Sequence, residues 1–339
     1  MKFEPMKAVY CYFFPEVRDI IHEVEKKIPD DIYMVTASIE QVQQSLDSLF
    51  CPALELPEND GIIDLDMIHY PIIDRIVKVY SDTIPGLGKF ANKYPTSGSS
   101  EGLFHILTKL KVNGVESINI LDGEYEGYQA QATNLGMKTI IHNEINAMKS
   151  EPGYWFISNP SARDGNIISN EFVNELANIG NKIILDFAYV GATKPQVYDV
   201  GHKNIEALVI SFSKPYGVFR SRIGGFAFTK DEVPSLYGNK WFKDTLRLFQ
   251  ALKLAEDIGP SGLYNKYRPI QKDIINQINK NFSLDMKTSD SYLLGYMRKK
   301  DTLHLNREQS LLIKQFERGD NYRFCLTPYF ENIERGIEK

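Results

Sequence analysis

Short apolar runs rich in Ile, Val and Phe alternate with helical patterns along the chain from about residue 95 onward. An uninterrupted apolar run bounded by turn residues predicts a buried strand, and apolar residues spaced by three or four predict a helix. Strands that alternate with helices are typical of parallel βαβ units, so we expect an α/β fold with a mostly parallel, mixed sheet flanked by helices. The expected strands are Ser117–Leu121, Lys138–His142, Tyr154–Ser158, Lys182–Phe187, Ala207–Phe212 and Gly224–Thr229.

The helices expected between these strands carry clear boundary signals. The first has apolar residues at i, i+3, i+4 and i+7 over Leu103–Leu110, just after a Ser-Gly-Ser-Ser sequence. Two more helices, over 124–135 and 169–179, are followed by Gly136 and Gly180. Glycine there favours the left-handed conformation that ends many helices, so both boundaries are well defined.

The pattern changes after Thr229 to two long helical stretches, Trp241–Ile258 and Gly262–Phe282. Two further strand candidates follow, Tyr292–Met297 and Tyr322–Thr327. This order predicts a sheet domain, a connecting helix and a small α+β lobe toward the C-terminal end.

The N-terminal part shows little periodicity apart from an amphipathic stretch at Glu16–Ile28. A chain of 339 residues is long enough for two domains of ordinary size. We therefore expect an N-terminal segment over 1–60 that acts as an arm or joins the small domain. The large domain is expected over 61–255, and the connecting helix with the small C-terminal domain over 256–339.

Composition and charge exclude several classes of protein. The chain has 39 Lys and Arg against 44 Asp and Glu, a net charge of −5, which argues against a broadly basic nucleic-acid binder. Cys11, Cys51 and Cys325 lie far apart without a C-x-x-C spacing, which predicts no disulfide framework. The histidines also lack the spacing of metal ligands, so we expect no metal site.

The apolar runs are too short for a membrane protein. The N-terminal run, Ala8–Phe14, is interrupted by Pro15 and is short for the apolar part of a signal peptide. No stretch approaches the roughly 20 apolar residues of a membrane span. We expect a soluble, cytoplasmic protein.

The segment Leu208–Gly225 carries an amine, two hydroxyls and a guanidinium around a predicted strand end. Lys214 is preceded by Ser211 and Ser213 and followed by Arg222. Ligands of α/β sheets bind at the carboxyl ends of strands, so Lys214 could form a Schiff base while its neighbours hold an anion such as phosphate. For a single Ser-x-Ser-Lys sequence taken alone, a surface lysine at a strand end is the better supported interpretation.

A carboxylate and a phenol lie at the end of another predicted strand. Asp186 follows the apolar residues of the Lys182–Phe187 strand, and Tyr189 comes three residues later. A buried carboxylate without a partner is unfavourable, so Asp186 requires a cation, for which a protonated pyridine nitrogen is one candidate. Tyr189 could then donate to a phenolate oxygen. The alternative is a strand-end aspartate that caps the next turn.

An anion site is predicted where the first helix begins. Gly98, Ser99 and Ser100 precede its apolar face. Helix N-terminal amides and serine hydroxyls bind anions, and glycine lets the backbone approach a ligand closely. Ordinary capping by serine explains the same residues.

Two more strand ends carry polar or aromatic residues. Asn159 follows the Tyr154–Ser158 strand, so its side chain is expected at the same edge of the sheet. Tyr125 and Tyr128 follow the Ser117–Leu121 strand, where an aromatic face could stack on a planar ring.

Together these signals, in this order from about Tyr94 to the C-terminal end, resemble the fold-type I pyridoxal-phosphate (PLP) enzymes of the aminotransferase class I/II family. The histidinol-phosphate aminotransferase branch is nearest in the style of its motifs. The resemblance implies the PLP-dependent transferase fold with pyridoxal 5'-phosphate as cofactor. It implies Lys214 as the Schiff-base lysine, Asp186 as the partner of the pyridine nitrogen, and Tyr189 with Asn159 at the phenolate oxygen.

The resemblance also assigns the remaining sites. Tyr125 would stack on the ring, and Arg323 would bind the substrate carboxylate. Tyr70 would reach the phosphate of a partner subunit in a homodimer with shared active sites. The phosphate group would be held by Gly98, Ser99, Ser100, Ser211, Ser213 and Arg222.

Two arginines depart from the family pattern. Arg163 stands in the loop after Asn159 in place of a usual second proline, and Arg220 stands where small residues are usual. We expect both near the substrate, where Arg220 could read an acidic or phosphorylated group. A solvated or inter-subunit arginine explains Arg220 equally well.

The resulting hypothesis is a PLP-dependent aminotransferase that moves an amino group between an amino acid, or a related amine, and a 2-oxo acid. The alternative is another reaction on the same fold, namely decarboxylation, β- or γ-elimination, or cyclisation of an amino acid, since fold alone does not separate these reactions. A non-catalytic binding module is a third interpretation. A module of that kind has no physical need for a lysine, an aspartate, a tyrosine and an arginine gathered at strand ends.

Overall fold

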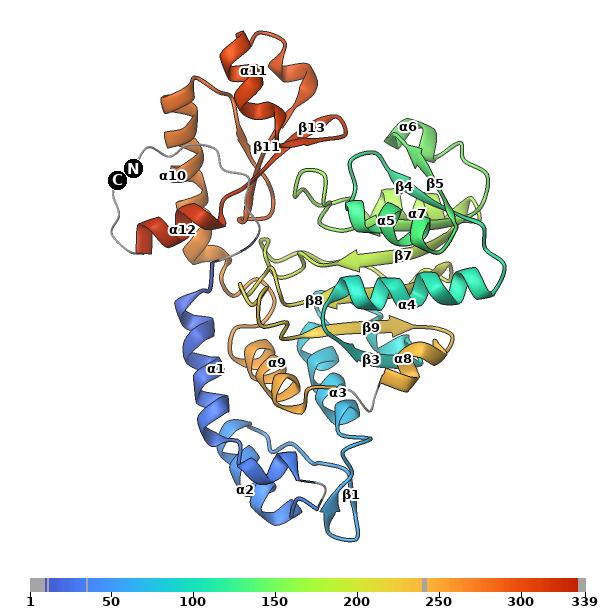
Figure 1. Ribbon diagram of the computed structural model, residues 1–339, viewed down its shortest axis with the longest axis vertical. Helices are drawn as coiled ribbons and strands as arrows, with labels where there is room; N and C mark the ends of the chain where they lie inside the picture. Colours follow the sequence, from blue (N-terminus) through green and yellow to red (C-terminus); the bar gives the residue numbers. More distant parts are fainter. Residues whose placement is uncertain (1–9, 11, 35, 240–242, 335–339) are drawn as a thin grey trace.

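A seven-stranded sheet forms the centre of the computed structural model, which describes residues 10, 12–34, 36–239 and 243–334. Its strands are β3 (Asn92–Thr96), β4 (Ser117–Leu121), β5 (Lys138–His142), β6 (Tyr154–Ser158), β7 (Lys182–Phe187), β8 (Ile205–Ser211) and β9 (Gly225–Thr229). Their order is β3-β9-β8-β7-β6-β4-β5, and β9 is antiparallel to both neighbours while the other pairs are parallel (Figure 1). The predicted α/β fold with a mostly parallel, mixed sheet is confirmed.

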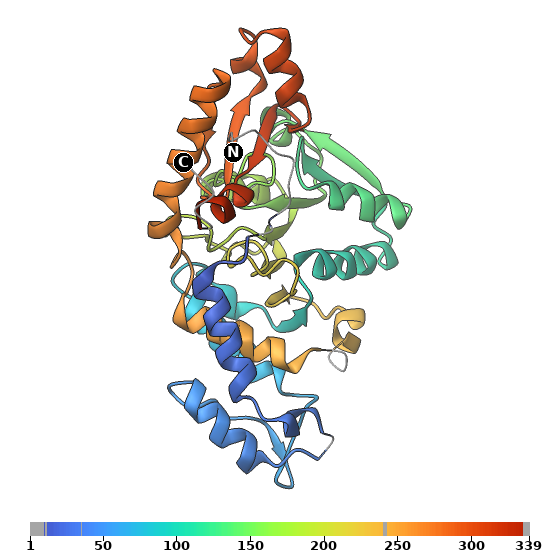
Figure 2. The same cartoon turned by 60° about the vertical axis from the view of Figure 1, so that its left-hand side comes forward.

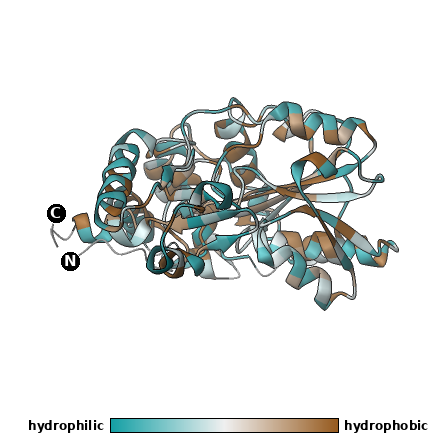
Figure 3. Cartoon of the chain, turned by 90° about the horizontal axis from the view of Figure 1, so that it is seen from above, coloured by the Kyte–Doolittle hydropathy of each residue, from teal (hydrophilic) through white to brown (hydrophobic). Residues whose placement is uncertain are grey.

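Helices cover both faces of this sheet. They are α3 (His69–Tyr80), α4 (Ser99–Val112), α5 (Glu126–Asn134), α6 (Glu144–Ala147), α7 (Asn170–Asn178), α8 (Pro234–Gly238) and α9 (Thr245–Asp257), with a short 3-10 helix η2 (Leu87–Lys89). Alternate strand residues enter different cores, because successive side chains of a strand point to opposite faces. Ile184 of β7 shares a core with Leu107 of α4, whereas Ile183 and Leu185 share the other core with Val173 of α7. Figure 3 shows the helices with both hydrophilic and hydrophobic segments, as expected when one face of each is buried.

Most element boundaries lie within two residues of the predicted ones, as is usual for helix ends. The helix predicted from Trp241 begins at Thr245, and Trp241 itself lies outside the described residues, as does Cys11. Within the described part of the chain, no helix combines the length and the apolar character that a membrane crossing requires.

A second, four-stranded antiparallel sheet forms the small lobe at the top of Figure 1. Its order is β10 (Lys287–Thr288), β11 (Leu294–Arg298), β13 (Asn321–Cys325) and β12 (Glu317–Arg318). The helices of this lobe are α10 (Tyr264–Phe282), η4 (Lys299–Thr302), α11 (Arg307–Lys314) and α12 (Thr327–Glu334). The predicted α+β lobe after a long helix is therefore present, whereas the exact limits assigned to the domains stay a prediction.

Of the N-terminal elements, the first helix and the residue before it contact both parts of the molecule. These elements are α1 (Pro15–Lys27), η1 (Asp30–Tyr33), α2 (Ile39–Leu49), β1 (Glu58–Asn59) and β2 (Ile62–Ile63). Helix α1 lies along α9 in both views of Figures 1 and 2, and their residues are in contact. Just before α1, the ring of Phe14 packs 4.5 Å from that of Tyr267 in the small lobe. Helix α2 was not predicted, although its buried Val42, Leu46 and Leu49 recur at the spacing of a helix and could have indicated it.

Candidate active site

Lys214 and Tyr189 come together at the carboxyl edge of the parallel strands. Tyr189 follows β7 and Lys214 follows β8, which are adjacent in the sheet. The Lys214 Nζ atom lies 3.9 Å from the centroid of the Tyr189 ring and 5.3 Å from that of Tyr10. The sequence predicted the first pair because neighbouring strand ends meet at one crevice. An amine in contact with two phenol rings is thus available to a ligand at this edge.

Asp186 provides a buried carboxylate beside this amine. Its Oδ2 atom accepts a 3.0 Å hydrogen bond from the Tyr128 hydroxyl, and its Oδ1 atom accepts one of 3.1 Å from the amide of Ala188. Burial raises the pKa of Asp186, and the Lys214 ammonium and the Tyr128 hydroxyl offset part of that rise. Burial of the ionised Asp186 carboxylate is unfavourable, so a further cation beside it would stabilise the site.

Tyr128 acts differently from the role that its aromatic character suggested. Its ring packs edge-on against Tyr125, with centroids 5.4 Å apart, and its hydroxyl reaches Asp186. Tyr125 itself is half-buried, and its hydroxyl is 3.0 Å from that of Ser100. Tyr125 and Tyr128 are three residues apart, and residues i and i+3 at a helix start share one face. The sequence therefore contained a signal that the two rings pack together.

The start of α4 forms a cup lined by three polar side chains. Gly98 has φ of +133°, and a Cβ atom placed on it would lie 3.7 Å from Nη1 of Arg222, 3.8 Å from Oγ of Ser211 and 3.9 Å from Oγ of Ser213. The Ser213 hydroxyl is buried and has no hydrogen-bond partner among the described residues. Because a buried polar atom without a partner is unfavourable, the cup favours a bound anion.

Gly225 shows why the cup has this shape. A Cβ atom on Gly225 would lie only 2.2 Å from the backbone nitrogen of Gly98, so β9 and the start of α4 touch backbone to backbone. Arg222, just before this contact, is exposed, and its guanidinium carbon lies 4.5 Å from the centroid of the Phe219 ring. Of the predicted phosphate-site residues, Gly98, Ser211, Ser213 and Arg222 therefore lie around one small volume. The Ser100 hydroxyl lies 3.0 Å from that of Tyr125 instead, and the Ser99 side chain is hydrogen-bonded to Asp186.

Arg323 faces the same crevice from the small lobe. Its Nη1 atom donates a 2.5 Å hydrogen bond to the carbonyl oxygen of Ala162. Burial lowers the pKa of Arg323, but Tyr10 and Tyr189, together with Cys325 and Glu126, raise it, so the pKa lies above its ordinary value. The Tyr10 and Tyr189 hydroxyls are hydrogen-bonded to each other. Tyr10 is thus a site residue that the sequence did not indicate, since it comes from a segment with no periodicity.

A second arginine of the small lobe lies on the same face as Arg323. In the β12–β13 pairing Arg318 is opposite Asn321, two residues from Arg323, so the two arginines are diagonal neighbours. Burial and the charge of Arg323 lower the pKa of Arg318, which forms an ion pair with Glu126 of α5.

The turn after Arg318 touches the large domain closely. A Cβ atom on Gly319 would lie 2.8 Å from the backbone nitrogen of Gly123, and one on Gly123 would lie 2.7 Å from the carbonyl oxygen of Arg318. The two glycines therefore permit a backbone contact between the lobes, beside the loop that carries Tyr125.

The expected roles of three other residues, Asn159, Arg220 and Tyr70, stay predictions. Both side-chain groups of Asn159 are bonded to the backbone of Ile168, at 2.9 and 3.0 Å, which favours a loop-shaping role over the expected contact with a phenolate oxygen. Arg220 is exposed. Tyr70 lies at the start of α3 with its ring 4.0 Å from that of His69, and this contact includes none of the residues at the crevice.

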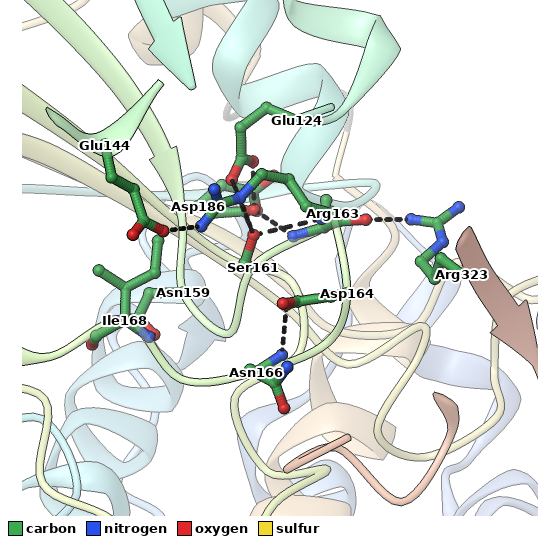
Figure 4. A network of polar contacts seen from close by, with 12 residues as sticks. Glu124, Glu144, Asn159, Ser161, Arg163, Asp164, Asn166, Ile168, Asp186 and Arg323 are labelled. Atoms are coloured by element: carbon green, nitrogen blue, oxygen red, sulfur yellow. Dashed lines mark hydrogen bonds and ion pairs between the residues drawn. The ribbon is translucent and has the colours of Figure 1, made fainter. Parts of the chain in front are cut away.

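Arg163 is bonded to three neighbouring protein groups. Its Nη2 atom donates 2.9 Å to Glu144, its Nε atom donates 2.9 Å to the Ser161 hydroxyl, and Nε lies 3.6 Å from Oε1 of Glu124 (Figure 4). Its side chain is 13% exposed. This arrangement favours a structural role for Arg163 over the expected substrate contact.

Glu124 is a second buried carboxylate that the sequence did not reveal. Its side chain is fully buried, and it accepts hydrogen bonds from the hydroxyls of Ser158 and Ser161. Burial raises its pKa, which the Arg163 guanidinium and both hydroxyls partly offset. Among the described residues, no group of three or more His, Cys, Asp and Glu side chains is arranged to hold a metal ion.

Comparison with known proteins defines the class of fold. No family model matches the sequence, and no curated protein matches it. Solved structures match the fold over nearly the whole chain, and they are aminotransferases and related PLP enzymes. The chain therefore has the PLP-dependent transferase fold, which confirms the predicted fold class.

Three of these structures illustrate the match. Aspartate aminotransferase from Thermus thermophilus is 10% identical with a TM-score of 0.63, over 98% of this chain and 88% of that one. L-threonine-O-3-phosphate decarboxylase from Porphyromonas gingivalis is 16% identical with a TM-score of 0.59, over 98% and 99%. A PLP-bound aminotransferase-like protein from Clostridium difficile is 12% identical with a TM-score of 0.61, over 94% and 87%. At these identities the comparison establishes the fold only.

Proposed function

We propose that this chain is a PLP-dependent aminotransferase that acts on an amino acid or a related amine, with a 2-oxo acid as second substrate. The observation that carries the proposal is the contact of Lys214 with Tyr189 beside buried Asp186, next to a cup that contains the unpartnered Ser213 hydroxyl. The fold shared with aminotransferases supports it.

The donor set fits pyridoxal 5'-phosphate. A phosphate would accept hydrogen bonds from the α4 amides, from Ser213 and from Arg222, where a Cβ atom on Gly98 would otherwise meet these groups. Asp186 would bind the pyridinium N–H, which supplies the cation that its burial requires. Tyr125 would lie against the ring, and Tyr189 would donate to its phenolate oxygen.

The protein groups then have defined tasks. When bound, the cofactor supplies a protonated ring that withdraws electrons from the α-carbon of a substrate amine. Lys214 would hold the cofactor through its Nζ atom, and as a free amine the same atom would take and return the α-proton of the substrate as general base. Asp186 keeps the ring nitrogen protonated. Arg323 binds the substrate carboxylate through a charge-assisted hydrogen bond and thereby fixes which bond at the α-carbon is oriented for cleavage.

One observation supports a homodimer with shared active sites. Arg222 borders the cup yet is exposed in the single chain. A partner chain that inserts its own Tyr70 at the cup would cover Arg222. Light scattering of the purified protein tests this, and a monomeric mass at micromolar concentration would contradict it.

The experiment that tests the cofactor uses absorbance. Added PLP should give the near-visible band of a lysine-bound cofactor, and Lys214→Ala should abolish the band. Lys253→Ala, at a salt-bridged lysine on α9, is the matched control and should keep it. An unchanged spectrum in Lys214→Ala would overturn the proposal.

A decarboxylase is the second candidate. L-threonine-O-3-phosphate decarboxylase matches 98% of this chain with a TM-score of 0.59, and fold alone does not separate decarboxylation from transamination. A panel of amino acids separates the two reactions. An aminotransferase converts the cofactor to its amine form in one turnover without a 2-oxo acid, whereas a decarboxylase releases carbon dioxide and returns the original band.

A further inference from the structure

The peptide unit of Ala162 joins the buried carboxylate of Glu124 to Arg323. Its amide donates a 2.6 Å hydrogen bond to the Ser158 hydroxyl, and that hydroxyl donates to Oε2 of Glu124. Its carbonyl oxygen accepts from Nη1 of Arg323 at 2.5 Å. Figure 4 shows Arg323 linked in this way to the loop that carries Ser161 and Arg163.

The other oxygen of Glu124 fixes the same loop from a second side. Oε1 accepts a 3.0 Å hydrogen bond from Ser161 and lies 3.6 Å from Nε of Arg163. The loop also closes on itself, since the amide of Gly165 donates 2.8 Å to the carbonyl oxygen of Ser161. Every link from Glu124 to Ala162 is buried, so solvent does not compete for these bonds.

The carboxylate is essential to this arrangement. Ser158 accepts the Ala162 amide while it donates its own hydrogen, which requires an acceptor on the far side. Arg163 brings a guanidinium into a largely buried position, where an unpaired charge would be strongly unfavourable. Glu144 contacts the same guanidinium but is 61% exposed, whereas Glu124 is the fully buried carboxylate beside it.

We propose that Glu124 and Ser158 are positioning residues that hold the Ala162 carbonyl, and through it Arg323, in the geometry that binds the substrate carboxylate. This inference rests on the proposed function, because it assigns Arg323 to that carboxylate. The pair contacts neither the substrate nor the cofactor. Its effect is confined to ligands that carry a carboxylate at the α-carbon.

The test compares binding with and without a carboxylate. The probes are the amino acid that converts the cofactor best in the panel above, its α-methyl derivative, which has no α-proton to lose, and the amine that lacks the carboxylate. Dissociation constants come from spectral titration of the PLP-loaded protein, per mole of bound PLP. Binding of the α-methyl derivative needs no turnover, so it does not depend on the reaction type.

Ser158→Ala and Glu124→Gln should weaken the α-methyl amino acid about tenfold, the effect of one lost hydrogen bond to a charged group. They should leave binding of the amine within about twofold and the PLP band intact. Glu144→Gln is the matched control on the same guanidinium, and it should change neither constant beyond about twofold.

Three results would overturn the inference. In the first, Ser158→Ala and Glu124→Gln weaken the amine as much as the amino acid. In the second, they lower thermal stability and leave both constants unchanged, as a purely structural pair would. In the third, Arg323→Gln leaves binding of the amino acid unchanged, which removes the role proposed for Arg323 itself. The third result would contradict the proposed function itself, because the Arg323→Gln variant tests the carboxylate contact directly and leaves Glu124 and Ser158 unchanged.

Discussion

The Tyr128 hydroxyl donates a 3.0 Å hydrogen bond to Oδ2 of Asp186, inside a core that solvent does not reach. Both side chains lie on the same face of the sheet, Asp186 on β7 and Tyr128 on α5 behind Tyr125. A hydroxyl that donates to a carboxylate favours its ionised form. Tyr128 thus helps to keep Asp186 charged, and with it a proton on a bound pyridine nitrogen.

The first prediction concerns this bond. Tyr128→Phe keeps the ring packing and removes the donor, which costs about 1.5–3 kcal/mol for a bond to a charged group. We expect kcat to fall about tenfold or more, with weaker retention of PLP, because Asp186 loses a group that stabilises its charge. Steady-state kinetics and fluorescence titration of PLP measure both quantities.

The control for this variant is Tyr198→Phe, another buried tyrosine, whose hydroxyl lies 3.4 Å from that of Thr193. It should leave kcat within about twofold, since a long bond between neutral groups contributes little. If Tyr128→Phe matches the wild type in kcat, the hydroxyl has no influence on Asp186.

The second prediction concerns the buried hydroxyl in the phosphate cup. Ser213→Ala removes an oxygen that has no hydrogen-bond partner among the described residues, so the free energy of unfolding of the apoprotein should stay within about 0.5 kcal/mol or rise. Affinity for PLP should fall about five- to tenfold, because one bond to the phosphate is lost. Chemical denaturation of the apoprotein and titration with PLP separate the two effects.

Ser211→Ala provides the contrast for that measurement. The Ser211 hydroxyl accepts a 3.2 Å hydrogen bond from the amide of Ser213. Unlike Ser213→Ala, the Ser211→Ala substitution should therefore destabilise the apoprotein by about 1 kcal/mol. A Ser213→Ala protein that loses as much apoprotein stability as Ser211→Ala would show that the Ser213 hydroxyl has a structural partner.

Local sequence and strand order were enough to predict much of this site. Lys214, Asp186 and Tyr189 are found together because adjacent parallel strands deliver their ends to one crevice, and strand limits follow from apolar runs. The cup at Gly98 follows from a Gly-Ser pattern before an amphipathic helix. These features follow from the periodicity of apolar residues and from the rule that the carboxyl ends of parallel strands form the ligand site.

The rest depends on contacts that no local pattern contains. Tyr10 reaches Tyr189 from a segment without periodicity, and Arg163 is paired with Glu124, although the two lie far apart in sequence. Asn159 is a similar case, since its amide is bonded to Ile168 in the following loop. Whether a charged or polar side chain binds a ligand or another protein group depends on which residues the fold places beside it. Sequence alone therefore cannot decide between the two for Arg163 or Asn159.

The third prediction follows from the raised pKa of Asp186. For an acid whose pKa is higher in the folded state, the contribution to stability is complete below the unfolded pKa and is lost as pH rises through the folded pKa. The apoprotein should therefore lose stability from this group as pH increases above the ordinary aspartate value of 3.8. The neutral side chain of Asp186→Asn lacks this dependence.

We accordingly expect the Asp186→Asn apoprotein to melt at the same temperature as the wild type, or higher, near pH 7, and to lose this advantage near pH 4. Glu124→Gln is the contrast and should lower the melting temperature near pH 7, because it leaves the largely buried Arg163 guanidinium without its buried carboxylate. Only Asp186→Asn should also abolish conversion of the cofactor by amino acids, since only Asp186 would contact the pyridine nitrogen. Thermal melts of both apoproteins across this pH range test the argument. A wild-type apoprotein whose stability increases from pH 4 to pH 7 relative to Asp186→Asn would mean that Lys214 compensates the buried carboxylate fully, leaving no electrostatic demand for a ring cation at this position.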